Sequence, residues 1–290
     1  MSIAVIITDR NTDELCHRLS LALPEVHIQQ WPNIANPESI KLAVLWNHPP
    51  GITATFPQLQ MVVSMGAGMD HIEADQAIAG NIKTARIVTD VLKQNMAQYV
   101  LQHILLRHRH YSDYQQQQNM HTWQILENSE MPTVGFLGLG VLGGFVADQC
   151  RCLGLKTLAW TQSQVHAVHP CYHGEAGLQL LCAHSDYLVV LLPMNRETKN
   201  IINRQTLSWC KPNCTLINVG RGGHVVEQDL LAALDAGVIQ HAVLDVFKQE
   251  PLPTGHPFWS HQKVTLTPHS SSRSDVEQTA EQIVTYYQNL

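Results

Sequence analysis

The chain has 290 residues, of which 44% are hydrophobic and 14% charged, and its formal net charge is -6 with neutral histidines. This length suits two domains of ordinary size with sizeable cores. The acidic balance, without a basic tract, argues against nucleic acid or an anionic membrane as a partner, and no apolar run is long enough to span a bilayer.

The first part of the chain has the pattern of an α/β unit. The apolar start at residues 3–8 lacks the basic region of a signal peptide and is expected to be a strand. Further strands are expected at residues 26–30, 42–46 and 61–64, with a helix at 12–21. Prolines separate these segments, at Pro24, Pro32, Pro37, Pro49, Pro50 and Pro57.

A helical pattern at residues 90–114 places Met96, Val100, Ile104 and Leu105 on one side. We expect this helix to cross from the first unit to a second one. Past Pro268, a last helix at residues 275–287 is expected to complete the first unit. The expected domains are therefore residues 1–95 plus 270–290, and residues 96–269.

Apolar runs recur in the second part, at residues 133–137, 156–160, 187–192, 215–219, 242–246 and 264–267. Continuous apolar runs are typical of strands that are buried on both faces of a parallel sheet. Strand alternating with helix is the doubly wound pattern. The expected fold class is α/β, with two doubly wound domains of Rossmann-like or flavodoxin-like type, parallel sheets and an interdomain cleft.

The run at residues 133–137 ends in a Gly-x-Gly-x-x-Gly turn, and a helical pattern follows at once. Gly138 allows the tight turn, Gly140 lets the backbone reach a pyrophosphate, and Gly143 lets the helix pack close to the strand. The helix N-terminus attracts the phosphate charge. This context predicts a dinucleotide-binding loop; the alternative is a structural glycine turn in another α/β protein.

Four further segments lie at or just after the expected carboxyl ends of strands, where such sheets place ligands. A glycine-rich turn offers N–H groups to an anion, and an arginine fork suits a carboxylate. A histidine passes protons near neutral pH, and a carboxylate can orient it. The segments are 64–70 (SMGAGMD), 218–223 (NVGRGG), 245–252 (DVFKQEPL) and 267–270 (TPHS).

In this order, these segments resemble the D-isomer-specific 2-hydroxyacid dehydrogenases over most of the chain. Within that family, the sequence is most similar to the glyoxylate/hydroxypyruvate reductase A-type branch. Residues 45–50 (LWNHPP), Gly143 onward, 224–227 (HVVE) and 229–235 (DLLAALD) carry the similarity to the branch. The resemblance implies that residues 1–95 plus 270–290 form the substrate domain and residues 96–269 the NAD(P)-binding Rossmann domain.

The resemblance also implies three catalytic residues. Arg221 holds the 2-oxo acid and polarises its carbonyl, His269 donates the proton as hydride arrives, and Glu250 pairs with His269. The structural alternatives are an exposed ion-pair arginine, a loop-capping histidine and a solvated Glu-Pro turn.

Substrate binding is implied for three more residues in the first part of the chain, besides Arg221 and His269. The backbone N–H groups of Ala67 and Gly68 bind the substrate carboxylate, and Trp46 forms part of the pocket wall. The alternatives are a turn without a ligand and a buried core tryptophan.

For the cofactor, the resemblance implies that Asp245 faces the nicotinamide carboxamide, with a turn or capping aspartate as the alternative. The expected cofactor-binding residues are Gly138, Gly140, Val141, Leu142, Gly143, Thr161, Gln162, Leu192, Pro193, Val219, Gly220, Asp245 and Met96. No metal site is expected. A zinc site at His166, His169, Cys171 and His173 matches no paired-cysteine template, and a solvated histidine-rich loop is the preferred interpretation.

The turn after the strand at residues 156–160 bears on the choice of cofactor. An NAD enzyme usually has an acid there for the ribose hydroxyls, but this chain has TQSQ, and no acid lies between Asp148 and Glu175. NADP(H) is therefore favoured over NAD(H). The arginine or lysine typical of the reductase branch is also absent, so hydroxyls, amides, His166 or the remote Arg196 would have to contact the 2′-phosphate.

The expected function is NAD(P)H-dependent reduction of a small 2-oxo acid, of the glyoxylate or hydroxypyruvate type, to the 2-hydroxy acid. The competing interpretations are a catalytically weak, dinucleotide-sensing relative that acts through protein partners, and a dehydrogenase of another α/β family. The presence of Arg221, Glu250 and His269 together favours the enzyme. The resemblance implies a homodimer, and the seven scattered cysteines are interpreted as reduced thiols of a cytoplasmic protein.

Overall fold

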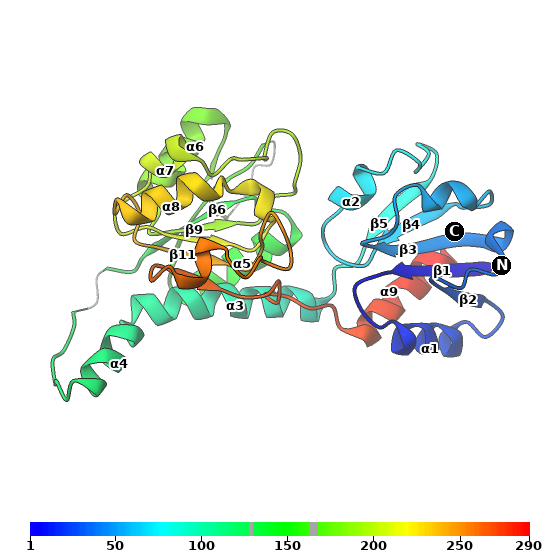
Figure 1. Cartoon of the computed structure of the whole chain (residues 1–290), viewed down its shortest axis with the longest axis horizontal. Coiled ribbons are helices and arrows are strands. Elements are labelled where there is room, and N and C mark those ends of the chain that lie inside the picture. Colours follow the sequence, from blue (N-terminus) through cyan, green and yellow to red (C-terminus); the bar gives the residue numbers. More distant parts are fainter. Residues whose placement is uncertain (128–129, 163–167) are drawn as a thin grey trace. The chain divides into compact units, whose positions relative to one another are not determined.

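Two compact units make up the computed structural model, which describes residues 1–127, 130–162 and 168–290. Unit 1 consists of Met1–Leu92 and Arg273–Leu290, and unit 2 consists of Lys93–Ser272 (Figure 1). The chain passes between the units after Leu92 and after Ser272. The sequence-based expectation placed these two points after residues 95 and 269.

Unit 1 is built on a five-stranded parallel sheet in the order β2-β1-β3-β4-β5, which is the flavodoxin-like order. The central strand β1 is buried along its whole length, in keeping with its continuous apolar sequence. The strands are β1 (Ser2–Ile7), β2 (His27–Gln30), β3 (Ile40–Trp46), β4 (Met61–Ser64) and β5 (Lys83–Arg86). The helices are α1 (Asp13–Ala22), α2 (Asp70–Glu73) and α9 (Val276–Gln288), with 3-10 turns at Pro37–Ser39 and Ile52–Thr55.

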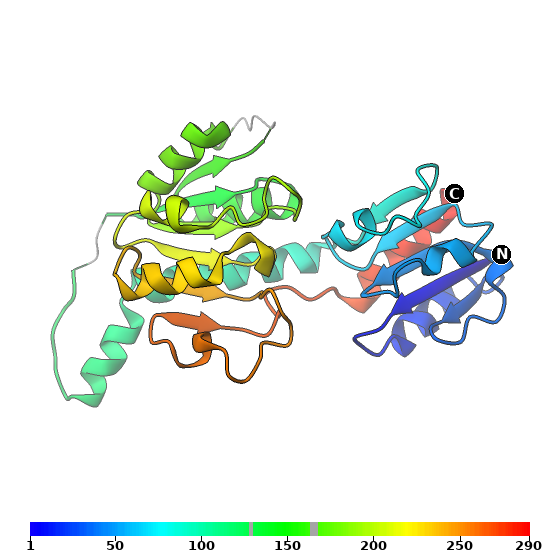
Figure 2. The ribbon, with the colours of Figure 1, turned by 45° about the horizontal axis from the view of Figure 1, so that its top comes forward.

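Hydrophobic clusters cover both faces of this sheet. Helices α1 and α9 lie side by side on one face, where Leu19 and Ile283 pack in one cluster with Ile3 of β1 (Figures 1 and 2). Phe56 and Ile72 belong to the cluster on the other face. The C-terminal helix therefore belongs to the core of unit 1, although more than 180 residues of chain separate it from the rest of that unit.

Unit 2 contains a seven-stranded parallel sheet in the order β12-β11-β10-β9-β6-β7-β8, so the order reverses at β6 (Figure 2). The strands are β6 (Thr133–Leu137), β7 (Lys156–Trp160), β8 (Cys171–Tyr172), β9 (Tyr187–Val190), β10 (Thr215–Asn218), β11 (His241–Leu244) and β12 (Val264–Leu266). The helices are α3 (Asp90–His108), whose first three residues belong to unit 1, α4 (Tyr111–Asn119), α5 (Val141–Cys152), α6 (Gly174–His184), α7 (Arg204–Ser208) and α8 (Glu227–Asp235), with 3-10 turns at Gly222–His224 and Pro257–Ser260. Together the two sheets confirm the predicted doubly wound α/β class.

The helices of unit 2 cover both faces of its sheet. The cluster on one face joins Val100 of α3 and Val146 of α5 to Phe136 of β6. The other face packs against α6 and α8, through Leu181 and Leu230. Since the strands are parallel, all their carboxyl ends lie at one edge of the sheet, and the loops that follow them meet there.

The expected single helix at residues 90–114 is wrong, because the structure breaks it into α3 and α4. His110 lies at the break in the left-handed conformation, with φ 54°. Leaving a helix in this way is uncommon for residues other than glycine. No helix in the described part of the chain combines the length and apolar character that a membrane span requires.

Candidate active site

The glycine-rich loop after β6 has the geometry of a phosphate cradle. Gly138 has φ +96°, and a Cβ there would lie 2.9 Å from the Leu191 carbonyl oxygen. A Cβ on Gly143 would lie 2.3 Å from the Gly138 carbonyl oxygen, so the start of α5 packs directly on the turn. At Gly140, by contrast, a Cβ would meet nothing within 4 Å. Two glycines are thus required by packing, whereas Gly140 leaves open space over the N-terminus of α5, as a pyrophosphate requires.

The cofactor-binding candidates around this loop differ in exposure. Val141 is 53% exposed at the first turn of α5, and Pro193 is exposed after β9. Leu192 and Val219 are only 7% and 6% exposed, so their side chains are buried and mainly their backbone groups are available to a cofactor. Met96 is 5% exposed within the cluster between α3 and the sheet, which gives it a packing role; its contact with a cofactor stays a prediction.

The turn after β7 contains Thr161, which is buried, and Gln162, which is exposed. The Gln162 amide donates a hydrogen bond to the carboxylate of Glu197, from the loop after β9. An acid therefore lies beside this turn although none is near it in the sequence. Ser163, Gln164 and His166, which the sequence also offered for the 2′-phosphate, lie outside the described residues.

Arg221 follows β10 in a loop that several contacts hold in place. The Asn218 side chain donates to the Arg221 carbonyl and accepts from the Gly220 N–H, at 3.0 and 3.2 Å. The Arg221 N–H donates to Nδ1 of the fully buried His224, at 3.1 Å. A Cβ on Gly222 would lie 1.9 Å from the backbone of Phe247, so this loop packs against the one that precedes Glu250.

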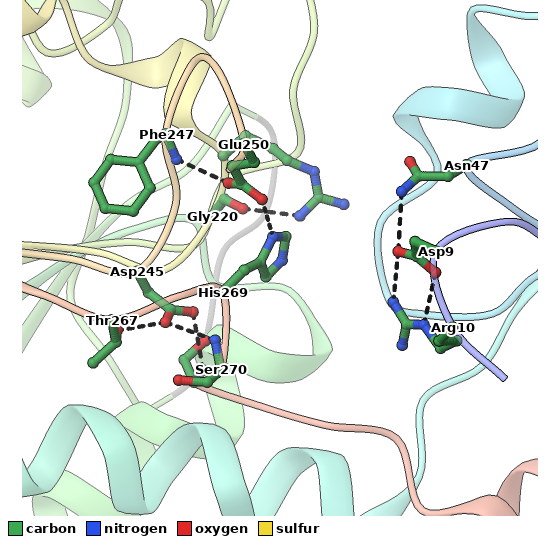
Figure 3. Close-up of polar contacts among 12 residues, drawn as sticks. Asp9, Arg10, Asn47, Gly220, Asp245, Phe247, Glu250, Thr267, His269 and Ser270 are labelled. Carbon is green, nitrogen blue, oxygen red and sulfur yellow. Dashed lines mark hydrogen bonds and ion pairs between the residues drawn. The ribbon is translucent and has the colours of Figure 1, made fainter. Parts of the chain in front are cut away.

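His269 and Glu250 form a hydrogen-bonded pair in unit 2 (Figure 3). His269 Nδ1 lies 2.7 Å from Glu250 Oε2, and Glu250 Oε1 accepts from the Phe247 N–H at 2.9 Å. Because an ionised carboxylate only accepts, Nδ1 carries the proton of this bond, and Nε2 is the atom left to exchange a proton with a ligand.

Electrostatics around Glu250 favour its charged form. Burial raises the pKa of Glu250, but the hydrogen bonds from His269 and Phe247, with the charges of His269 and Arg221, outweigh burial and lower it overall. Arg221 is thus within electrostatic reach of Glu250, and the three predicted catalytic residues gather in one region of unit 2.

Asp245 anchors the segment that carries His269. Its buried carboxylate accepts from the Thr267 hydroxyl at 2.5 Å and from the N–H groups of Ser270 and Ser271 at 2.8 and 2.9 Å (Figure 3). These bonds are those of the turn aspartate weighed as the alternative from the sequence. The contact of Asp245 with a nicotinamide carboxamide stays a prediction.

The backbone of His269 is held in an unusual conformation. It has φ 50°, the left-handed region that residues other than glycine rarely adopt. Its N–H donates to the Asp245 carbonyl at 2.9 Å, which ties it to the end of β11. Non-glycine residues in this region cluster at functional sites, where surrounding contacts hold them.

In unit 1, the turn after β4 has its carbonyl groups engaged and its N–H groups available. The Ser64 hydroxyl donates to the Gly68 carbonyl at 2.7 Å, and Arg86 donates to the Ala67 carbonyl at 3.3 Å. Within the described residues, the N–H groups of Ala67 and Gly68 donate to no protein acceptor. The turn is therefore suited to bind an anion through its backbone.

Trp46, at the end of β3, packs beside this turn. A Cβ on Gly66 would lie 3.0 Å from the Trp46 ring, so only glycine fits there without a shift. The Arg10 guanidinium lies 5.7 Å from the ring centroid, and Asp9 pairs with Arg10 at 2.8 Å and accepts from Asn47 (Figure 3). The half-buried Trp46 packs against the hydrophobic cluster of unit 1 and also lies beside Arg10 and the turn, so its place in a pocket wall stays a prediction.

Sequence reasoning missed several residues that position the predicted ones. Asn218 and His224 brace the Arg221 loop, and Tyr99 of α3 bonds Thr267 at 2.6 Å. Since the Thr267 hydroxyl proton goes to Asp245, Tyr99 donates to Thr267. Asn218 and His224 stand in segments that the sequence had singled out, at 218–223 and 224–227, but no role was given to them, whereas Tyr99 lies in no motif and only its tertiary contact reveals it.

Two histidines of the segment considered for zinc, His169 and His173, form hydrogen bonds to protein groups. His169 is 1% exposed, and its two ring nitrogens contact Thr157 at 2.8 Å and Asp148 at 3.0 Å. His173 contacts the Thr161 carbonyl at 2.7 Å. No metal-binding group of three or more such side chains occurs among residues 1–127, 130–162 and 168–290.

Comparisons with known proteins agree with this geometry. The profile of the D-isomer specific 2-hydroxyacid dehydrogenase NAD-binding domain matches residues 101–271. A glyoxylate/hydroxypyruvate reductase A from Yersinia enterocolitica is 34% identical over 281 residues, which cover 94% of this chain and 89% of that protein. A second protein of that name, from Serratia proteamaculans, is 36% identical over 272 residues, covering 89% and 85%.

Solved structures are similar over the whole chain. A D-isomer specific 2-hydroxyacid dehydrogenase from Xanthobacter autotrophicus, in complex with NADPH, has a TM-score of 0.93 and 30% identity, covering 99% of this chain and 94% of that one. An NADPH-dependent glyoxylate/hydroxypyruvate reductase from Sinorhizobium meliloti, in complex with NADP and sulfate, has a TM-score of 0.88 and 31% identity, covering 100% and 96%.

Proposed function

This chain belongs to the D-isomer specific 2-hydroxyacid dehydrogenase family, and from that premise we propose that it reduces a small 2-oxo acid, of the glyoxylate or hydroxypyruvate type, with hydride from NADPH. The observation that carries the proposal is the His269–Glu250 pair, at 2.7 Å, within electrostatic reach of Arg221. A histidine held by a carboxylate, beside a guanidinium, suits protonation of a carbonyl oxygen and binding of a carboxylate.

The residues divide the work as follows. Arg221 and the protonated His269 stabilise the negative charge that develops on the carbonyl oxygen, and this charge is larger in the transition state than in the substrate. Glu250 orients the imidazole so that Nε2 donates the proton. The N–H groups of Ala67 and Gly68 bind the substrate carboxylate, and Trp46 limits the substrate's other end. When bound, NADPH supplies the hydride to the carbonyl carbon.

The residues around the β6–α5 turn fit a dinucleotide, because the structure has open space over Gly140 where a side chain would otherwise stand. NADP(H) is the cofactor favoured by the sequence, and similar structures from Xanthobacter autotrophicus and Sinorhizobium meliloti contain NADPH or NADP. We propose that Val141 and Leu142 contribute N–H groups to the pyrophosphate and that Thr161 and Gln162 face the ribose end.

The sensor interpretation is not supported. The relatives that match along most of the chain are named as reductases, and the three catalytic residues are all present and mutually close. A protein that only senses the dinucleotide needs no proton donor and no carboxylate pairing with it.

We further propose a homodimer that uses α4 and the stretch from Met120 to Ile125. Trp123 is 98% exposed, Ile125 84% and Met120 66%, which is unusual for large apolar side chains gathered in one stretch. A second copy of the chain would remove them from water. A cytoplasmic location is proposed because all seven cysteines are free thiols, which a reducing compartment maintains.

The test is a panel of glyoxylate, hydroxypyruvate, pyruvate and bulkier 2-oxo acids, each with NADPH and with NADH. We expect turnover of the small acids, and His269→Ala should lower kcat by about 100-fold or more. His184→Ala is the control, because His184 is exposed in the same unit and its ring forms a hydrogen bond to the Leu180 carbonyl, within its own helix. Near-normal reduction by a folded His269→Ala variant contradicts the proposal.

A further inference from the structure

His224 lies between two loops that follow neighbouring strands of unit 2. It ends the 3-10 turn at Gly222–His224, directly after Arg221 in the loop that follows β10, and it is fully buried. Strand β9 pairs with β10 in parallel, so the loop after β9, which contains Pro193, lies at the same edge of the sheet. A buried histidine between these loops is placed to hold both of them.

On one side, the His224 ring holds the loop of Arg221. Nδ1 accepts the Arg221 N–H at 3.1 Å, and the His224 N–H donates to the Arg221 carbonyl at 3.2 Å. The ring also packs against Gly220, where a Cβ would lie 3.1 Å from Nδ1. The Gly220 carbonyl in turn accepts from the Arg221 guanidinium at 2.8 Å. The ring therefore supports both the backbone of Arg221 and a carbonyl group that its side chain contacts.

On the other side, the same ring reaches the loop after β9. Nε2 lies 3.3 Å from the Pro193 carbonyl oxygen, which also accepts from the Thr198 hydroxyl at 2.6 Å. A Cβ on Gly223 would lie 2.9 Å from the Met194 side chain, so the two loops are closely packed. Because a carbonyl oxygen only accepts, Nε2 carries a proton, whereas Nδ1 accepts and carries none. His224 is thus a neutral imidazole in one defined tautomer.

We propose that His224 is a positioning residue, which couples the loop of Pro193 to the substrate arginine through the two nitrogens of one rigid ring. This role rests on the proposed reductase function, in which Pro193 contacts the cofactor and Arg221 binds the 2-oxo acid. Hydride transfer needs the donor and the carbonyl carbon in a near-attack arrangement, and a displacement of about 1 Å can lower the rate ~100-fold. An imidazole suits this role because the separation of its two nitrogens is fixed.

Two variants of His224 separate the two contacts of the ring. In His224→Asn, the amide oxygen can take the position of Nδ1 and accept the Arg221 N–H, but the side chain is too short to reach Pro193. In His224→Gln, the NH₂ group can take the position of Nε2 and donate to the Pro193 carbonyl, but the acceptor at the position of Nδ1 is lost. Each variant therefore keeps one of the two hydrogen bonds.

The two Michaelis constants should respond in opposite ways. In His224→Asn, we expect KM for NADPH to rise about three- to tenfold while KM for glyoxylate changes less than about twofold, the scale set by one lost hydrogen bond. In His224→Gln, KM for glyoxylate should rise about three- to tenfold while KM for NADPH changes little. In both variants kcat should fall, because each releases one of the two loops that hold the reactants.

His169 provides the matched control in the same unit. It is also buried and also uses both ring nitrogens, which contact Thr157 and Asp148, but it belongs to neither of the two loops. His169→Asn and His169→Gln should lower the melting temperature, as the His224 variants do, and leave both KM values unchanged. Melting temperatures and KM values together distinguish positioning from a general loss of packing.

Three results overturn the proposal: an equal rise of both KM values in each His224 variant, wild-type kinetics of both, or unfolding of both under conditions in which the two His169 variants fold. Calorimetric binding of NADPH separates this role from the reductase function. If the wild type binds NADPH but reduces no 2-oxo acid, the proposed function fails. In that case, weaker NADPH binding by His224→Asn than by His224→Gln supports the coupling to Pro193, and equal binding contradicts it.

Discussion

Replacing Glu250 with glutamine tests how the carboxylate supports His269. The Phe247 N–H must still meet an oxygen at 2.9 Å, so the glutamine carbonyl would take that position. Its NH₂ group would then face His269 Nδ1, which the wild-type carboxylate faces at 2.7 Å. An NH₂ group cannot accept the Nδ1 proton, so the protonated imidazole loses its partner while the shape of the turn is kept.

The magnitude follows from the bond that is lost. A hydrogen bond to a charged group contributes roughly 1.5–3 kcal/mol. The His269 and Glu250 side chains are 40% and 35% exposed, so water screens the pair and the lower part of that range applies. At about 1.4 kcal/mol for each tenfold change, we expect kcat/KM for reduction to fall roughly 10- to 30-fold at neutral pH.

The assay measures kcat/KM for glyoxylate reduction at neutral pH, from NADPH absorbance. Glu227→Gln is the control, because Glu227 also lies beside a histidine, His256, at 3.6 Å. A folded Glu250→Gln enzyme with wild-type kcat/KM would refute the role of Glu250.

Three further predictions concern the cofactor loop, the ribose turn and the anchored segment. Gly140→Ala should keep the wild-type melting temperature but weaken NADPH binding by about tenfold or more. Gly143→Ala should instead lower the free energy of unfolding by ~1–3 kcal/mol, because its Cβ would lie 2.3 Å from a carbonyl oxygen. Equal melting temperatures of the two variants would contradict this prediction. Glu197→Gln removes a negative charge beside the Gln162 turn, and should raise kcat/KM for NADPH over that for NADH by roughly two- to fivefold; an unchanged ratio would place the 2′-phosphate elsewhere. Thr267→Val removes the hydroxyl that donates to Asp245, and should cost ~1–2 kcal/mol in denaturant unfolding and lower kcat; wild-type kcat would show that the segment is held without this bond.

The fold class follows from the sequence because buried parallel strands leave continuous apolar runs. Three strands were predicted with the bounds that the structure has, at residues 61–64, 133–137 and 156–160. Strand β5 (Lys83–Arg86) was missed, since it is a mostly exposed edge strand without an apolar run. The two-residue strand β8 is too short for any periodicity to indicate.

In the candidate site, too, the residues in short sequence motifs could be predicted, whereas contacts between distant parts of the chain could not. Gly138, Arg221 and His269 lie in short motifs at strand ends, so residue type and spacing were enough to select them. The contacts that hold them were not predictable, because Tyr99 reaches Thr267 across 168 residues of chain. Glu197 escaped notice for the same reason, since the acid beside the ribose turn comes from a different strand end.

The unit boundaries bear on how such an enzyme diversifies. His269, Glu250, Arg221 and the bonds that hold them all lie in unit 2, together with the glycine-rich loop. The turn at Ala67 and the side chains around Trp46 lie in unit 1. In the proposed site, the turn at Ala67 and Trp46 contact the substrate, so substitutions in unit 1 should change which 2-oxo acid is accepted while the proposed proton donor stays intact. For an engineer, substrate scope and chemical competence are two separately adjustable properties, and a library confined to the loops of unit 1 samples the first without sacrificing the second.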